Sequence, residues 1–220
     1  MTTYLVMQQR IADELARTDL TTQIPKAIQT AIKHYERQRF YFNQKTTGSF
    51  ATVADQEYYT SSDLADIPNF IQIDSMYFTM SGTRLTILPA AFERIEESQS
   101  GAVTGQPEYF AYYAQKIRLY PIPSDAWTVT VAYHYRLTAL SADADTNAWV
   151  TDAEELIRQK AKRTLALDVI RDRDLAESAA ILEKEAYDGL RSETRRRFSN
   201  QRLMVDPALA GAGGYNIQFQ

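Results

Sequence analysis

Apolar residues recur every three or four positions along the first 40 residues, in two runs that a short polar link separates. This spacing places each run on one face of an α-helix. The two runs are Tyr4, Met7, Ile11 and Leu15, then Ile24, Ile28, Ile32 and Tyr35. Thr2 or Thr3 can cap the first helix, and Thr22 can cap the second. The link TDLTT is short, which predicts an antiparallel helical hairpin.

The period changes to two between residues 40 and 137, where aromatic and β-branched residues replace straight-chain helix formers. The clearest strand is expected to bury one face, made of Trp127, Val129, Val131, Tyr133, Tyr135 and Leu137. Further strands are expected at residues 50–53, 56–60, 70–79, 84–88, 108–114 and 116–120. Ser81 and Gly82 suit a tight hairpin turn, and a short helix is expected at 90–97.

Helical periodicity returns after the polar loop SADADTN. Thr151 and Glu154 have the spacing of a capping box, which predicts a helix start, and the sequence RDRD predicts its end. A second helix is expected from near Asp174, with Glu177 completing a similar pair, to about Arg197. The residues predicted to face inward are Ala153, Ile157, Ala161, Leu165 and Val169, then Leu175, Ala179, Leu182, Ala186 and Leu190.

Together these elements predict an α+β fold. Its helical body consists of N- and C-terminal helical hairpins at residues 1–40 and 141–198, and an antiparallel β domain is inserted at residues 41–140. An extended C-terminal tail is expected at residues 199–220, because that segment is rich in Gly and has no sustained period.

Composition then narrows the classes of function. The 220 residues include no Cys, which excludes thiol nucleophiles, disulfides and Cys-ligated metals. The net charge is -4, and this argues against a dedicated DNA binder, since phosphate contacts by Lys and Arg supply most nonspecific affinity. The chain has neither a long apolar span nor the apolar core of a signal peptide. We therefore expect a soluble, unexported protein. Ten of the 14 Tyr lie in the β region.

Signatures of catalysis are missing from the sequence. His34 and His134 fall in different predicted regions, and the chain contains none of the patterns HExxH, GxSxG, GxGxxG or GxxxxGK[ST]. We expect no catalysis and no cofactor.

One segment has the ligand spacing of a calcium-binding loop. Asp143, Asp145, Asn147 and Glu154 stand at positions 1, 3, 5 and 12 of an EF-hand pattern. Ala148 stands where that loop requires Gly, and a strand is expected where the entering helix would be. The same residue types are ordinary loop formers, and Glu154 already serves the capping box. The loop interpretation is favoured, and cation binding stays open.

Arg195, Arg196 and Arg197 form the only basic concentration, with Arg191 and Arg202 nearby. Cations at a helix C-terminus complement the helix dipole, whereas the same guanidinium groups can also engage acceptors on a partner or bind DNA. We favour docking to a partner. In that hypothesis the tail residues that accompany the arginines are Leu203, Met204, Tyr215, Ile217 and Phe219.

Four stretches taken together carry a resemblance. IADELARTDL leads into AIQTAIKHYERQRFYFNQ, and TGQPEYFAYYAQKIRLYPIP and TNAWVTDAEELIRQKAKRTLALDVIRD follow in that order. Over residues 9–197 this arrangement resembles the head-to-tail adaptor (connector) proteins of short-tailed bacteriophages. The resemblance implies a structural virion protein that forms a dodecameric ring on the portal, extends the DNA channel and provides the attachment site for tail components.

The same resemblance implies the partners and the location. The partners are the portal protein, tail nozzle or tube proteins and tail fibre proteins, and genome DNA passes without sequence-specific binding. The protein would assemble in the host cytoplasm and reside in the virion neck, with its C-terminal extension reaching into the portal. Under this interpretation Tyr59 and Tyr113, aromatics expected on polar sheet faces, are predicted at subunit or tail contacts.

Two other classes of function remain as alternatives. A cell-wall glycan hydrolase acting during infection would need a cleft with two facing carboxylates. A nucleic-acid-binding module would show steeply salt-dependent DNA affinity.

Overall fold

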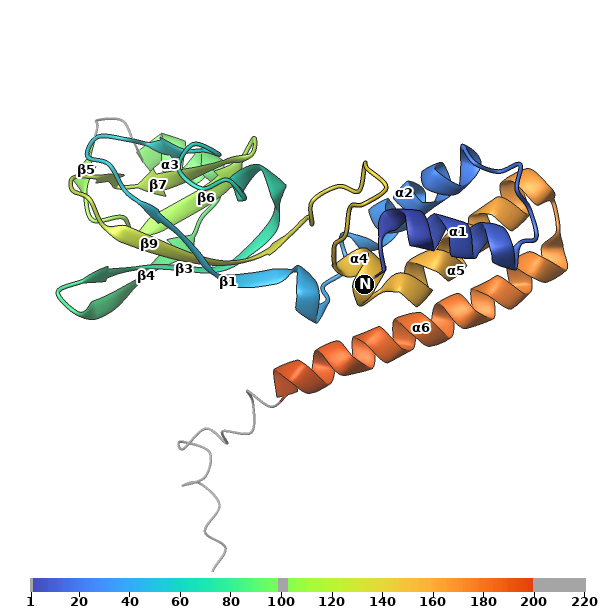
Figure 1. Cartoon of the computed structure of the whole chain (residues 1–220). Helices are drawn as coiled ribbons and strands as arrows, with labels where there is room; N and C mark the ends of the chain where they lie inside the picture. Colours follow the sequence, from blue (N-terminus) through green and yellow to red (C-terminus); the bar gives the residue numbers. More distant parts are fainter. Residues whose placement is uncertain (1, 99–102, 200–220) are drawn as a thin grey trace, which may run out of the picture.

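The computed structural model describes residues 2–98 and 103–199, which form a helical body and a β domain (Figure 1). The N- and C-terminal helices meet in the helical body, and the segment between them builds the β domain. The predicted α+β fold is confirmed. Within the described ranges, no helix is both long enough and apolar enough to cross a membrane.

The N-terminal hairpin consists of α1 (Tyr4–Glu14) and α2 (Gln23–Tyr35). Thr3 caps α1, since its hydroxyl accepts a hydrogen bond from the backbone N–H of Val6. The predicted cap by Thr22 is wrong, because its hydroxyl bonds to the Gln23 side chain and not to the backbone of the first turn. The predicted stripes are buried at Tyr4, Met7, Ile11, Ile24, Ile28 and Tyr35.

The C-terminal helices begin with α4 (Ala148–Thr151), which Asn147 caps by accepting a hydrogen bond of 2.9 Å from the N–H of Trp149. The predicted capping box is wrong. Thr151 lies inside α4, and the Glu154 carboxylate pairs with Arg10 of α1. Asn147 takes the capping role because its short side chain reaches the amide two residues ahead while its own backbone is extended.

The central helix of the body is α5 (Glu154–Leu165), which packs against both α2 and α6 (Arg173–Ser199). Its last turn continues into a π-helix, η3 (Ala166–Ile170), and Arg171 ends this segment with a φ of 61°. A π-turn advances the side chains by less per residue than an α-turn does. Val169 is consequently rotated off the buried stripe and is 41% exposed, so its predicted inward position is wrong.

The stripe that α6 buries also differs from the predicted one. Leu182, predicted to face inward, is 43% exposed. The start of α6 also differs from the prediction, which paired Asp174 with Glu177. The cap is the carboxylate of Asp172, which accepts a hydrogen bond of 3.0 Å from the N–H of Leu175. A search for apolar residues cannot find this stripe, because two of its members are polar. The buried residues are Ala176, Ala179, Glu183, Leu190 and Thr194.

Glu183 joins three helices through one buried carboxylate, which is 5% exposed. The Tyr35 hydroxyl of α2 donates to it at 2.5 Å, and Lys160 and Arg163 of α5 approach within 3.2 and 3.1 Å. Burial alone would raise the pKa of Glu183, but the hydrogen bonds from Tyr35 and Arg163 and the charge of Lys160 outweigh it and lower that pKa. The folded state therefore stabilises the ionised carboxylate.

We expect Glu183→Gln to lower the free energy of unfolding by about 2–3 kcal/mol at neutral pH, because it leaves two partly buried cations without their counter-charge. The wild-type carboxylate titrates below its ordinary pKa of 4.5. Its contribution is thus complete above that pH and is lost as the pH falls below it. Denaturant unfolding from acid to neutral pH should show the two proteins converging in acid, with exposed Glu185→Gln as the matched control. A difference in the free energy of unfolding between the two proteins that did not change with pH would contradict this prediction.

The β domain is a seven-stranded sheet in the order β1-β9-β3-β4-β6-β7-β2. Its strands are β1 (Gln44–Ala51), β2 (Tyr58–Tyr59), β3 (Phe70–Met80), β4 (Thr83–Pro89), β6 (Tyr109–Tyr113), β7 (Lys116–Tyr120) and β9 (Thr128–Tyr135). A second, two-stranded sheet pairs β5 (Thr104–Gly105) with β8 (Ile122–Pro123). Short 3₁₀ turns, η1 (Tyr41–Asn43) and η2 (Ile67–Asn69), precede β1 and β3. The predicted turn at Ser81 and Gly82 joins β3 to β4, and both residues have positive φ.

The sheet is mixed, which corrects the purely antiparallel domain that was predicted. β4 and β6 run parallel, with Leu88 opposite Tyr109 and Pro89 opposite Phe110. Parallel neighbours require a crossover between them. The helix expected at 90–97 provides it as α3 (Phe92–Ser98), which lies between the two strands in the chain.

The sheet curls until its two edge strands meet. The rings of Phe50 on β1 and Tyr59 on β2 have centroids 4.8 Å apart. The cluster of buried apolar residues in this domain contains none from the helical body, whose own cluster includes Phe40. Each part therefore has a core of its own, while the expected domain boundaries at residues 40/41 and 140/141 stay predictions.

Candidate interaction surfaces

Tyr59, predicted on a polar face at a subunit or tail contact, lies in the core of the β domain with no exposed surface. Its hydroxyl accepts a hydrogen bond from the N–H of Val53 at 3.2 Å and donates to the carbonyl of Gln56 at 3.2 Å. Its predicted place on a polar surface is wrong, because the curl of the sheet turns β2 over the core. Tyr59 is a packing residue of its own chain.

Tyr113 is 59% exposed and keeps its place as a candidate contact residue. Its ring stacks on Phe92 of α3 with centroids 4.6 Å apart. Tyr109 lies four residues before Tyr113 on the same face of β6, and the exposed Leu88 lies opposite Tyr109 on β4. These three side chains expose apolar surface around the parallel β4–β6 pair, which makes it a candidate contact surface.

We expect Tyr59→Ala to lower the free energy of unfolding by about 3–5 kcal/mol, as a large-to-small change in a packed core does. Tyr113→Ala should change it by less than about 0.5 kcal/mol, because the ring is mostly solvated. Chemical denaturation of both variants checks this. Equal losses at the two positions would contradict the burial of Tyr59.

Glu57 and Glu96 come together around one buried guanidinium in the β domain. Arg118 is 2% exposed, its Nε lies 2.8 Å from Glu96, and a second ion pair joins it to Glu57. The Tyr58 ring covers the guanidinium, with its centroid 4.6 Å from Cζ. Both carboxylates thus serve as counter-charges to Arg118, and the group holds α3 onto the outer face of the sheet.

The basic cluster at the end of α6 divides into two kinds of residue. Arg197 lies 3.7 Å above the ring of Tyr41 and forms an ion pair of 2.5 Å with Glu193, so it fixes the helix end against η1. The hydroxyl of Tyr41 in turn donates to Asp152 at 2.8 Å, and burial and this bond raise the pKa of Tyr41 to about 12. Arg195 and Arg196 are exposed on the same helix.

We expect Arg197→Ala to lower the free energy of unfolding slightly and to speed hydrogen exchange in the last turns of α6. The reason is the loss of one cation–π contact and one exposed ion pair. Arg195→Ala should leave both quantities unchanged. The hypothesis would fail if the two variants exchanged alike.

The other predicted docking residues are Arg202, Leu203, Met204, Tyr215, Ile217 and Phe219, and all of them lie outside the described residues. Their docking role stays a prediction.

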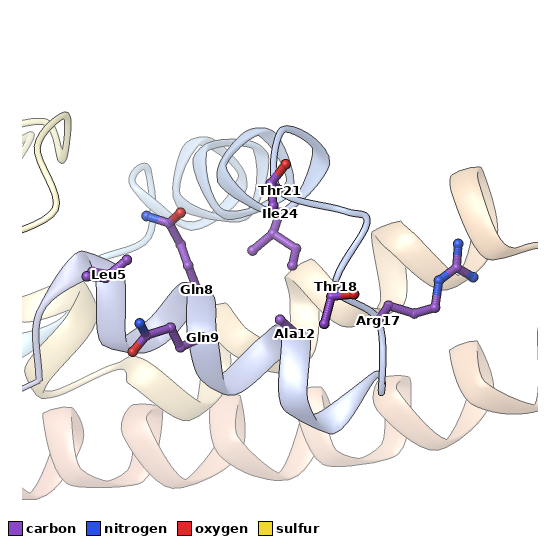
Figure 2. Close-up of a pocket in the computed structure, with 8 residues that line it drawn as sticks. All are labelled: Leu5, Gln8, Gln9, Ala12, Arg17, Thr18, Thr21 and Ile24. Carbon is purple, nitrogen blue, oxygen red and sulfur yellow. The ribbon is translucent and has the colours of Figure 1, made fainter.

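A groove opens on the outer side of the N-terminal hairpin (Figure 2). Its volume is about 290 Å³, and its lining combines apolar side chains, Leu5, Ala12 and Ile24, with a polar rim from Gln8, Gln9, Arg17, Thr18 and Thr21. Arg17 also pairs with Asp19 at 2.6 Å. The groove can accept an apolar side chain from outside.

In the loop with calcium-ligand spacing, three of the four side chains form hydrogen bonds or ion pairs within the protein. Asp145 accepts hydrogen bonds from the N–H groups of Ser141 and Ala142 at 2.6 and 2.7 Å, and these bonds lower its pKa. Asn147 caps α4, and Glu154 pairs with Arg10. Across the described ranges, no three His, Asp or Glu side chains are grouped as a metal would require. These contacts favour the loop interpretation of Asp145, Asn147 and Glu154.

The two histidines have separate surroundings. His34 lines a polar hollow of about 430 Å³ together with Glu183 and Lys184, whereas His134 is buried on β9 between β1 and β3. Burial lowers the pKa of both imidazoles. They are therefore uncharged at neutral pH.

Sequence reasoning missed the groove and the exposed Ile181 of α6, which is 69% exposed. The sequence did hold a signal for Ile181, since small residues at 176, 179 and 186 mark the buried face and leave Ile181 on the opposite one. The groove has no such signal, because it depends on how the link between α1 and α2 folds back.

Comparison with known proteins adds one finding. The family model described as SU10 adaptor protein matches residues 2–206, which include both the helical body and the β domain. A search of curated proteins finds no match.

Proposed function

The chain belongs to the SU10 adaptor protein family, whose members are structural head-to-tail adaptors of phages and not enzymes, and from that premise we propose how this adaptor works. It forms a dodecameric ring on the portal, extends the DNA channel and provides the attachment site for tail components. The family match over residues 2–206 is the observation that carries the proposal.

The helical body faces the portal in this proposal, and the C-terminal extension docks there. Arg195 and Arg196 lie exposed in the last turns of α6, immediately before that extension, where their guanidinium forks can meet carbonyl or carboxylate acceptors. The apolar side chains of the extension, Leu203, Met204, Tyr215, Ile217 and Phe219, would fill pockets of the portal protein.

Tail nozzle, tube or fibre proteins would meet the β domain. The exposed side chains around the β4–β6 pair, Tyr113 above all, offer large amphipathic surfaces that suit protein contacts. The ring would reside in the virion neck after assembly in the host cytoplasm.

A mild acidic charge supports a conduit for DNA. Each phosphate contact by a Lys or Arg would retain the sliding genome, and the chain has 28 acidic against 24 basic residues. The nucleic-acid-binding alternative has no comparable support. The hydrolase alternative needs two facing carboxylates, and Glu57 and Glu96, which lie together in the β domain, are both engaged by Arg118.

Deletion of residues 199–220 tests the docking. We expect it to weaken portal binding by about 100-fold or more, because it removes the anchoring side chains, and to leave the melting temperature unchanged, because both cores lie outside the deleted segment. The matched control keeps residues 200–220 in shuffled order and should bind as weakly. Calorimetry or interferometry with purified portal measures both. Wild-type affinity in the deletion variant would refute docking through the extension.

A further inference from the structure

The groove on the α1–α2 hairpin has the build of a receptor for apolar side chains. Its floor is apolar, its rim consists mainly of uncharged amides and hydroxyls, and its volume is about 290 Å³. A cavity of about 150 Å³ holds a benzene molecule, so one or two aliphatic side chains fit. The rim can accept them without burying an unpaired charge.

A matching projection lies on α6. Ile181 is 69% exposed, more than any other large apolar residue that the structure describes, and Leu182 beside it is 43% exposed. Successive residues of an α-helix turn by about 100°, so Ile181 lies nearly opposite the buried Ala179 and Glu183. It points away from the helical core.

The groove and this projection cannot meet within one chain. Figure 1 shows α6 along one side of the helical body and α1 and α2 on another, with α5 packed against both α2 and α6. Two different patches on different sides of one subunit are what a heterologous contact between copies requires, and such contacts close into rings.

The charges around the two patches are complementary. The first part of α6, residues 173–189, holds four exposed acidic and two exposed basic residues besides the buried Glu183, and Lys184 is paired with Asp188 at 2.8 Å. The segment that carries the groove, residues 4–39, holds six basic and four acidic residues, and Arg17 in the groove lining is paired with Asp19. Glu177 and Glu185 flank Ile181 at one turn on either side, so they would approach the basic segment.

We propose that Ile181 and Leu182 of one subunit insert into the α1–α2 groove of the next subunit, which forms the repeating contact of the adaptor ring. This inference rests on the proposed ring. The occupant of the groove is a second copy of this chain, and neither the portal nor the C-terminal extension fills it.

Two charge-inserting variants test each half of the contact. Leu5→Glu places a carboxylate on the groove floor in the first turn of α1, where the helix dipole favours it, and Ile181→Glu places one on an exposed helical position. We expect each to weaken subunit association on purified portal by about tenfold or more, since the carboxylate would be buried at the contact. The matched control, Val53→Glu, puts the same charge on an exposed site of the β domain and should assemble as wild type does.

A cross-link identifies which surfaces touch. The chain has no Cys, so Ala12→Cys with Ile181→Cys introduces the only thiols, and a disulfide forms only if the two Cα atoms come within about 7 Å. We expect covalent oligomers on mild oxidation of the assembled complex. Replacing Ile181→Cys by Ser192→Cys moves the thiol along the same face by three turns, about 16 Å, and should give none.

The outcomes separate this inference from the proposed function. Wild-type rings with unaffected Leu5→Glu and Ile181→Glu variants, or with no cross-link at position 181, would overturn the inference and leave the adaptor function intact. Absence of any portal binding by the wild-type protein would overturn the proposed function, and the cross-link at high protein concentration would then decide the contact on its own.

Discussion

The antiparallel pairing of β1 with β9 makes one helical body from the two ends of the chain. The pair brings Gln44 opposite His134, so the chain enters and leaves the β domain at adjacent points. The register shifts between Lys45 and Gly48, and a Cβ at position 48 would collide with the ring of Tyr133, so β1 can lie against β9 there only with glycine. Helices more than 100 residues apart in sequence are thereby held close enough to share a core.

Polar contacts then fix the parts that this pairing brings together. Glu183 joins α2, α5 and α6, while Glu14 of α1 pairs with Lys162 of α5 at 2.8 Å. Glu36 pairs with Arg136 at 3.2 Å across the junction to the β domain. Because each part has its own core, the two can present separate surfaces: the groove and Ile181 on the helical body, and the β4–β6 surface on the sheet. That division suits an adaptor between two different partners.

The amphipathic stripes of α1 and α2 could be predicted from the sequence, as could the face of β9 made by Val129, Val131 and Tyr133, because these buried residues are apolar and regularly spaced. The stripe of α6 could not, since Glu183 and Thr194 occupy core positions through specific hydrogen bonds. The capping box failed for a local reason: Asn147 caps the short helix α4, and Thr151 is the last residue of that helix. The burial of Tyr59 depends on the curl of the sheet, and the parallel pairing of β4 with β6 depends on its strand order. The alternation of residues along a strand indicates neither which face is buried nor which strands are neighbours.

The candidate sites divide in the same way. The arginine cluster at the end of α6 could be found from the sequence alone, because its members are consecutive. The stacking of Arg197 on Tyr41 could not, because it depends on the fold. Cryo-electron microscopy of the adaptor bound to purified portal would show how the subunits are arranged. We expect a closed ring whose helical bodies contact one another and the portal, with the β domains directed toward the tail. A complex in which the β domains contact the portal, or in which adaptor copies bind without touching one another, would contradict this expectation.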